Sequence, residues 1–173
     1  MNDLSGTMIP VVAVMLVSVL LAAPLQAQDR WTQIWKQSIE VPAPDFTLTD
    51  LEGKTVRLSD YHGQVVLLQF TNTTCPHCRA IIPYLKELYA TYKNEGLVLL
   101  AIDIQETPER VSAYAGKYEL PYPVLLDRDA AVALSYGIVG IPNLVLINRD
   151  GVIMCRQCRS IDILLDTLLK KGD

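Results

Sequence analysis

Short apolar runs alternate along this chain with stretches whose apolar residues recur at helical spacing. The runs are leucine-rich or β-branched, which predicts buried strands at residues 65–70, 97–104, 123–126 and 143–147. Helices are predicted at residues 76–94, from residue 107 onward, at 129–136 and at 161–169. This order of elements predicts an α/β fold with a central sheet of mixed direction, covered by helices on both faces.

Two predicted hairpins flank these elements. Residues 46–49 and 55–58 alternate in polarity around a turn that contains Gly53. Near the other end, the turn at residues 148–151 is typical of a hairpin and is followed by a returning strand at 152–156.

The helix predicted at residues 76–94 contains two prolines with different consequences. Pro76 occupies the first helical position, where its missing N–H does no harm. Pro83 lies inside the helix and should kink it. Gly96 follows its end, where glycine commonly stops a helix.

The N-terminal segment is apolar and almost uncharged. Its first 28 residues contain no Lys or Arg and a single acid, Asp3. This predicts a secretory signal peptide over residues 1–27, or alternatively an uncleaved membrane anchor, because the uncharged run at 8–27 approaches the roughly 20 residues that a membrane span needs. Either way the remainder is predicted to be exported to the periplasm or an equivalent extracytoplasmic space, with residues 28–42 as a linker and 43–173 as one domain.

Charge and cysteine content narrow the function classes. The chain has 15 Lys and Arg against 19 Asp and Glu, a net charge of −4 without a basic cluster, so no nucleic-acid partner is expected. Its four cysteines form two pairs of equal spacing. In an exported protein, paired cysteines favour disulfides.

The first pair, Cys75 and Cys78, lies where the strand at 65–70 gives way to a helix. The N–H groups and dipole at a helix start stabilise an anion, so the thiolate of Cys75 should be favoured. Cysteines three apart share a helix face with Cα atoms about 5–6 Å apart, which fits a disulfide. The pair can therefore cycle between dithiol and disulfide, and no cofactor or metal ion is expected there.

Four features in this order resemble the TlpA/ResA-like family of exported thiol–disulfide oxidoreductases, which have the thioredoxin fold. They are the N-terminal hairpin with Pro44-Asp45-Phe46, the Cys75-x-x-Cys78 motif, the kinking Pro83 and Gly140-Ile141-Pro142 before a strand. The resemblance covers residues 43–169. It implies that Cys75 is the exposed nucleophile, that Cys78 is the resolving thiol, and that Pro142 is cis and faces the disulfide.

The chain departs from this family around the motif. Family members usually carry tryptophans at the positions of Thr71 and Thr74, and the buried acid of thioredoxins falls at Gln69. Apolar Ile81 stands where many members have glutamate. Such acids are thought to manage the proton of the resolving cysteine, so water or another group must serve Cys78 here.

The dipeptide between the cysteines matches that of DsbA-type periplasmic oxidases. A histidine at a helix start can stabilise the neighbouring thiolate, and a lower thiolate pKa makes a disulfide more oxidising. We therefore predict that His77 tunes Cys75, and that Pro76, Ile141 and Pro142 shape the site.

Three further polar or titratable residues receive smaller predictions. His62 is interpreted as a turn residue without a role. Asp103, at a strand end, is interpreted as a solvated acid near the rim of the site. Asn72 stands three residues before Cys75 where a peroxiredoxin would have threonine, which disfavours peroxiredoxin chemistry.

The second pair, Cys155 and Cys158, is not a usual feature of the family. In this fold a hairpin returns the chain to the active-site rim, so the pair is predicted to lie about 10 Å from the first, two strand spacings away. Three interpretations stay open: a structural disulfide, a second redox pair that exchanges electrons with the first, or a metal site shared by both pairs. The metal site ranks last, because the separation between the pairs exceeds ordinary zinc-ribbon spacing.

The predicted activity is thiol–disulfide exchange with protein thiols, in which Cys75 attacks and Cys78 resolves. The resemblance implies a reductant, for example of apocytochrome thiols in cytochrome c maturation, working with a membrane or periplasmic redox partner. The dipeptide Pro76-His77 and the missing acids instead favour an oxidase or isomerase. A zinc or copper carrier that uses both cysteine pairs is the alternative from another class.

Overall fold

The computed structural model describes residues 41–158 and 161–169 of the 173-residue chain. The predicted signal peptide or anchor at residues 1–27 and nearly all of the linker lie outside these residues. Residues Val41–Asp173 form one compact unit. Within the described part, no helix has the length and apolar character needed to cross a membrane.

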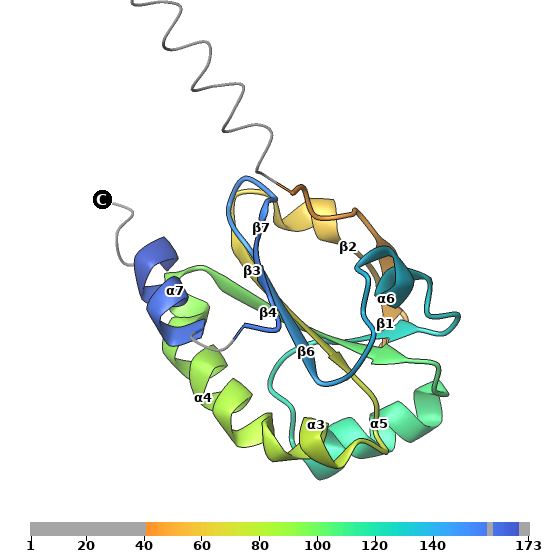
Figure 1. The fold of residues 1–173 in the computed structure, drawn as a ribbon. Helices are drawn as coiled ribbons and strands as arrows, with labels where there is room; N and C mark the ends of the chain where they lie inside the picture. The colour runs from red at the N-terminus through yellow and green to blue at the C-terminus, as the bar shows by residue number, and fades with distance from the viewer. Residues whose placement is uncertain (1–40, 159–160, 170–173) are drawn as a thin grey trace, which may run out of the picture. The chain divides into compact units, whose positions relative to one another are not determined.

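A seven-stranded mixed sheet forms the centre of this unit, with the strand order β2-β1-β5-β4-β3-β6-β7 (Figure 1). Its strands are β1 (Thr47–Asp50), β2 (Thr55–Arg57), β3 (Val65–Thr71), β4 (Leu97–Ile104), β5 (Val124–Asp127), β6 (Asn143–Ile147) and β7 (Ile153–Arg156). The predicted mixed α/β sheet and both predicted hairpins are thus confirmed, and the architecture is that of a thioredoxin-like fold.

The helices are short and connect or cover the strands. They are η1 (Leu58–Tyr61), α3 (Pro76–Ala80), α4 (Ile82–Tyr92), η2 (Lys93–Glu95), α5 (Pro108–Lys117), α6 (Ala131–Ser135) and α7 (Ile161–Leu169). Thr107 caps α5 as predicted, because its Oγ1 accepts a hydrogen bond from the N–H of Arg110 at 3.5 Å.

The helix predicted at residues 76–94 is divided rather than kinked. It breaks at Ile81, between α3 and α4. Pro83 is the cause, because it has no N–H for the carbonyl of Arg79 and its ring collides with that carbonyl. Gly96 ends the segment with φ +100°, a left-handed conformation that glycine adopts without strain.

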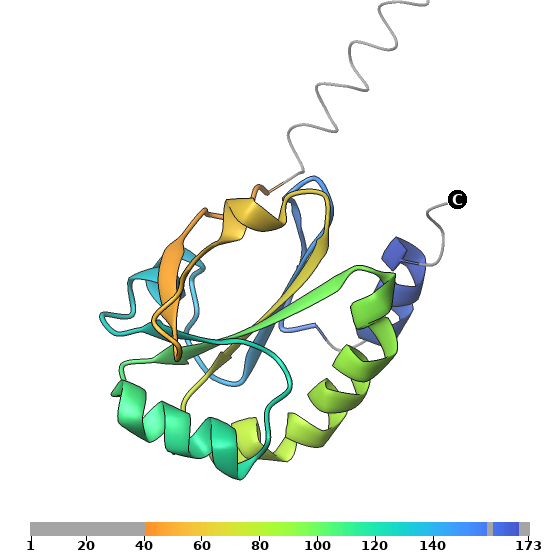
Figure 2. The same cartoon turned by 180° about the vertical axis from the view of Figure 1, so that it is seen from behind.

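Helices cover the sheet on two faces, each with its own core (Figure 1 and Figure 2). On the α4 face, Leu85 of α4, Val111 of α5 and Leu165 of α7 pack against strand residues such as Leu67 and Leu99. On the α6 face, a second core lies beneath α6 and η1, and includes Phe46, Leu58, Phe70, Val132 and Tyr136. Burial of each large apolar side chain contributes about 2 kcal/mol, so the two cores hold the sheet rigid.

The strand directions bring several chain segments together at one end of the sheet. β3, β4 and β5 are parallel, and β6 is antiparallel to β3. The carboxyl ends of β3, β4 and β5 therefore meet the start of β6 at the same edge. The pairing of Thr71 with Asp103 and of Phe70 with Asn143 places these residues there.

Candidate active site

The first cysteine pair lies at the end of β3, on the loop that starts α3. Cys75 is the N-cap residue of α3 and Pro76 is its first residue, as predicted. Cys75 and Cys78 form a disulfide with their Cα atoms 5.2 Å apart. Cys75 is half-buried, whereas Cys78 is completely excluded from solvent. A partner can therefore reach only the first sulfur.

Hydrogen bonding at the helix start favours negative charge on Cys75. Its Sγ accepts the N–H of Cys78 at 3.1 Å, which satisfies one of the free donors of the first helical turn. A thiolate accepts such a bond more strongly than a neutral sulfur does. The reduced form of the pair is thereby stabilised through Cys75.

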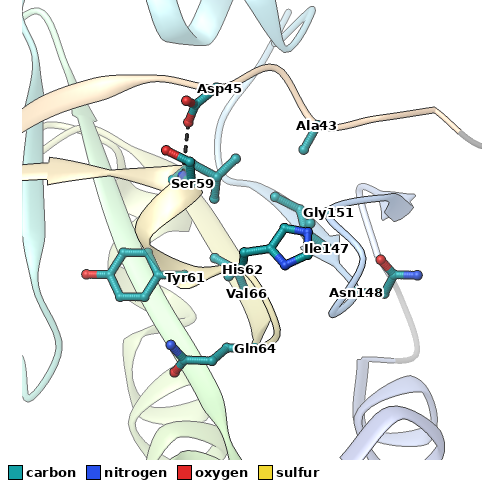
Figure 3. A pocket seen from close by; sticks show the side chains of 11 residues that line it. Ala43, Asp45, Ser59, Tyr61, His62, Gln64, Val66, Ile147, Asn148 and Gly151 are labelled. Carbon is teal, nitrogen blue, oxygen red and sulfur yellow. Dashed lines mark hydrogen bonds between the residues drawn. The ribbon is translucent and has the colours of Figure 1, made fainter.

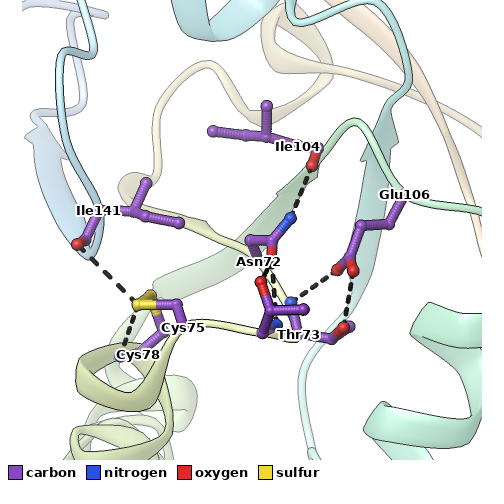
Figure 4. Close-up of a disulfide and its surroundings, with 8 residues drawn as sticks. Asn72, Thr73, Cys75, Cys78, Ile104, Glu106 and Ile141 are labelled. Carbon is purple, nitrogen blue, oxygen red and sulfur yellow. Dashed lines mark hydrogen bonds between the residues drawn. A yellow bond between two sulfur atoms is a disulfide. The ribbon is translucent and has the colours of Figure 1, made fainter.

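The loop before β6 faces the disulfide. The Ile141–Pro142 peptide bond is cis, and the backbone oxygen of Ile141 lies 3.9 Å from the Sγ of Cys75 (Figure 4). Ile141 and Pro142 are half-buried, and Val139 just before them is 93% exposed. The approach to Cys75 is therefore bordered by a backbone carbonyl and apolar side chains.

Asn72 organises the loop between β3 and Cys75. Its Nδ2 donates to the carbonyl of Ile104 at 3.1 Å, which ties the loop to the end of β4. Its Oδ1 accepts the N–H of Thr74 at 2.9 Å and also the Thr74 hydroxyl. This is an Asx turn, so an Asn in the loop could have suggested it from sequence.

Glu106 holds the same loop from the other side (Figure 4). Its carboxylate accepts the N–H of Thr73 at 2.6 Å and the Thr73 hydroxyl at 2.7 Å. The Nε of Arg110 lies 3.1 Å from Glu106 and 3.1 Å from the Thr73 hydroxyl oxygen. The sequence contained no signal for this contact, because Glu106 belongs to the loop after β4, far from the cysteine motif.

The prediction that Asp103 is solvated was wrong. Asp103 is only 2% exposed, because it lies inside β4 with β3 and β5 paired on either side. Burial, and next the negative charge of Glu106, raise the pKa of Asp103 to about 8. Asp103 is therefore a buried acid at the end of β4, and it ionises close to neutral pH.

Two positions near Cys78 that carry acids in related proteins have uncharged residues here, Gln69 and Ile81. Gln69 is buried and lies opposite Leu144 of β6, while Ile81 packs against the core of the α4 face. His77 is exposed on α3, and its tuning role stays a prediction. No acid from these two positions can serve Cys78.

The second cysteine pair forms a disulfide at the same end of the sheet, with its Cα atoms 5.6 Å apart. Cys155 belongs to β7 and pairs with Leu146. The N–H of Cys158 donates to the carbonyl of Leu144 at 3.4 Å, and its Sγ lies 3.4 Å from the same oxygen. Both cysteines pack against the core of the α4 face.

A mainly apolar pocket, whose lining includes none of the four cysteines, lies elsewhere on the domain (Figure 3). It is a pocket of about 190 Å³ lined by Ala43, Leu58, Tyr61, His62, Ile147 and others. His62 therefore borders a pocket rather than only a turn. Among the described residues, no group of three or more His, Cys, Asp or Glu side chains is placed to hold a metal ion.

Comparisons with known proteins agree with this geometry. Residues 39–156 match the AhpC/TSA family. The chain is 37% identical to a thiol-disulfide oxidoreductase ResA of Bacillus thuringiensis over 127 residues, 73% of each chain. It is 40% identical to a ResA of Geobacillus kaustophilus over 109 residues, 63% of each chain.

Solved structures show the same likeness. A putative protein disulfide isomerase from Bacteroides thetaiotaomicron superposes with a TM-score of 0.68 at 35% identity, over 76% of this chain and 89% of that one. A putative thiol:disulfide interchange protein DsbE from Chlorobium tepidum superposes with a TM-score of 0.66 at 29% identity, over 71% and 88%.

Proposed function

This chain belongs to the AhpC/TSA family and is a thiol–disulfide oxidoreductase, and from that premise we propose that Cys75 and Cys78 exchange electrons with protein partners outside the cytoplasm. One observation carries the assignment of roles: the sulfur of Cys75 is reachable and hydrogen-bonded at a helix start, whereas Cys78 is fully buried behind it. Cys75 is therefore the nucleophile and Cys78 the resolving thiol.

The reaction proceeds in two exchanges. The Cys75 thiolate attacks one sulfur of a partner disulfide, and the other partner sulfur leaves as a thiolate and takes a proton. Cys78 then loses its proton and attacks the Sγ of Cys75, which releases the second partner sulfur. Two electrons and two protons pass to the partner, and the Cys75–Cys78 disulfide remains.

The surface beside Ile141 and Pro142 is the proposed docking place for the partner backbone. Ile141 is half-buried and its carbonyl oxygen lies 3.9 Å from the Cys75 sulfur, and the exposed Val139, two residues earlier, adds apolar surface to the same loop. A peptide that lies along this loop brings its own sulfur to Cys75. Pro76 and His77 border the same sulfur from α3.

We propose that the protein reduces the disulfide of apocytochrome cysteines to thiols in cytochrome c maturation, and is itself reduced again by a membrane or periplasmic electron donor. The names of its ResA relatives support a thiol–disulfide reaction, and the apolar N-terminal segment supports export, either as a cleaved signal or as an anchor. The dipeptide Pro76-His77 favours the opposite direction, which makes the direction of electron flow the property to measure.

The reduction potential of the Cys75/Cys78 pair tests the direction. A value near that of thioredoxin, about −270 mV, supports a reductant, and a value near −120 mV supports an oxidant. The measurement is an equilibrium titration with glutathione or dithiothreitol, read by alkylation and mass spectrometry. The Cys155→Ser/Cys158→Ser protein is used alongside, so that the titrating pair is unambiguous.

Trapping tests the two roles. In Cys78→Ser protein the mixed disulfide cannot be resolved, so partner adducts should accumulate that dithiothreitol releases. The matched control is Cys158→Ser, which has the same substitution in the second pair. Adducts that form equally in the control, or that persist when Cys75 is also replaced, would contradict the assignment.

We assign the second disulfide, Cys155–Cys158, a structural role. Cys155 lies on an edge strand rather than at a helix start, and both residues pack against the core. The bond closes the chain at the end of β7, directly after its pairing with β6. If the pair instead passes electrons to the first, its removal will change the turnover of Cys75.

A further inference from the structure

Two acids meet beneath the active-site loop. The carboxyl groups of Asp103 and Glu106 are neighbours, and the charge of Glu106 and a side-chain hydrogen bond to it are among the causes that raise the pKa of Asp103. Asp103 is 2% exposed and the Glu106 side chain 6%. Two carboxyl groups form such a bond only when one of them carries a proton, because two carboxylates have acceptors and no donor. A hydrogen bond within this pair therefore requires one proton between them.

The surroundings decide which acid keeps the proton. Glu106 accepts two hydrogen bonds from Thr73 and is paired with Arg110, and all three contacts stabilise its charged form. Asp103 has no such donors, and its Oδ1 is buried without a hydrogen-bond partner within the described residues. These contacts favour a neutral Asp103 beside a charged Glu106.

Other groups around Asp103 do not change this assignment. On β3 it faces Thr71 and on β5 Leu126, neither of which titrates. On α5, Arg110 attracts an ionised Asp103 but lies mostly in solvent, with 59% of its side chain exposed. The Tyr114 hydroxyl, also on α5, is buried without a partner in the described part of the chain, and the charge of Arg79 on α3 reaches it.

We propose that Asp103 is a positioning residue for the redox site: as a neutral carboxyl it donates a hydrogen bond to Glu106, and so keeps the Glu106 carboxylate on Thr73 and the loop that presents Cys75 in place. Ionised Asp103 would set two like charges side by side in a site with little water. Glu106 would then move towards solvent and release Thr73, two residues before the nucleophile. The predicted effect on turnover rests on the proposed role of Cys75, whereas the predicted contact between Asp103 and Glu106 does not.

The structural half of the proposal is tested in the oxidised protein, where no thiol titrates. Carbon-13 NMR follows the carboxyl carbons of Asp103 and Glu106 and the amide of Thr73 from about pH 5 to pH 10. We expect Asp103 to titrate at alkaline pH and the Glu106 and Thr73 signals to move with the same midpoint. An Asp103 that titrates in the ordinary acid range, or a Thr73 amide that does not follow it, overturns the proposal.

Three variants give the test its controls. Asp103→Asn keeps a hydrogen-bond donor for Glu106 at every pH, so the Thr73 transition should disappear while its low-pH position is retained. Asp103→Ala removes the donor, so Thr73 should show the released position throughout. Asp127→Asn alters another fully buried acid at a strand end, one that caps α6 instead, and should leave the Thr73 transition unchanged.

Turnover is then compared as a ratio, which cancels the pH dependence of the thiols themselves. The kcat/KM of Asp103→Asn for insulin disulfides, divided by that of the unaltered protein, should be near one at about pH 6 and rise at least about threefold by pH 9.5. A flat ratio overturns the positioning role even if the NMR transition is present. If instead neither protein reduces insulin at any pH, the proposed function is wrong, and the NMR titration alone decides whether Asp103 positions Glu106.

Discussion

The two Cys-x-x-Cys disulfides have the same spacing and nearly the same Cα separation, 5.2 Å and 5.6 Å, yet their environments differ. Cys75 begins a helix, and its sulfur accepts a backbone N–H. Cys155 lies in a strand, and the sulfur of Cys158 lies 3.4 Å from a backbone carbonyl oxygen, whereas the carbonyl oxygen that faces the Cys75 sulfur is 3.9 Å away and a backbone N–H lies closer, at 3.1 Å. A donor next to sulfur favours the thiolate and an acceptor disfavours it. The local backbone, rather than the motif, separates a reactive pair from a structural one.

The loops that present the two pairs differ as well. Glu106, from the loop after β4, and Arg110, from α5, hold Thr73. Asn72 ties the loop itself to the carbonyl of Ile104. The second pair is attached to the sheet through the carbonyl of Leu144. The first site is therefore held in position by the side chains of Glu106 and Arg110, which its own strand does not supply.

The largest expected difference concerns the nucleophile. Cys75→Ser should lower the rate of insulin reduction by at least about a thousandfold, because a hydroxyl replaces the attacking thiolate. Cys155→Ser should change that rate by less than about twofold. The comparison is made on initial rates with dithiothreitol as electron donor. Comparable losses in both variants would mean that the second pair takes part in electron transfer.

The next difference concerns stability. Both disulfides join residues three apart, so each constrains the unfolded chain by the same entropic contribution, about 2 kcal/mol. Cys155→Ser/Cys158→Ser should therefore lower the free energy of unfolding by about 2 kcal/mol, whereas Cys75→Ser/Cys78→Ser should lower it by less than about 1 kcal/mol, because the helix start stabilises the reduced pair. Urea unfolding under oxidising conditions measures both.

The difference in stabilisation between the two disulfides also predicts a difference between their reduction potentials. If the unfolded chain treats both pairs alike, each 1.4 kcal/mol of extra stabilisation corresponds to a reduction potential about 30 mV lower. The second pair should thus be reduced only at potentials at least about 20 mV below the first. Equal reduction potentials in a glutathione titration would mean that the helix start does not distinguish the first pair from the second.

A smaller effect is expected at the loop itself. Thr73→Val removes the hydroxyl that donates to Glu106 and accepts from Arg110. The lost hydrogen bonds are expected to cost about 1 kcal/mol of transition-state stabilisation, which should lower kcat/KM roughly fivefold. Thr73→Ser keeps the hydroxyl and serves as the control. The potential of the Cys155/Cys158 pair should be the same in both variants, and a parallel change there would point to a general loss of structure.

The last expected difference is a pH-dependent stability that belongs only to the first site. Burial raises the pKa of Asp103 from 3.8 to about 8, so between these values the folded chain keeps a proton that the unfolded chain has released. Its stability should fall as pH rises through this window and level off above it. Asp103→Asn lacks this dependence, so its free energy of unfolding in urea, relative to the unaltered protein, should rise by on the order of 3 kcal/mol between about pH 5 and pH 8. A difference that stays constant with pH would show that Asp103 ionises normally.

Local patterns determined much of this protein. The apolar run of β3, the start of α3 at Pro76 and the glycine stop at Gly96 follow from backbone preferences that act within a few residues. The cysteine motif at a strand-to-helix junction was sufficient to indicate redox chemistry. Pro83 also indicated an irregularity in the helix: the sequence predicted a kink, and the structure shows a break at Ile81.

Only the tertiary structure decided how the site is supported and which acid is buried. Asp103 and Glu106 look like ordinary strand-end acids in the sequence, because nothing local says that β3, β5 and α5 will enclose them. The contact of Glu106 with Thr73, and the carbonyl that faces Cys158, likewise join segments far apart along the chain. Burial and long-range hydrogen bonds depend on how the elements pack, so a motif can identify reactive residues while the fold sets their electrostatics.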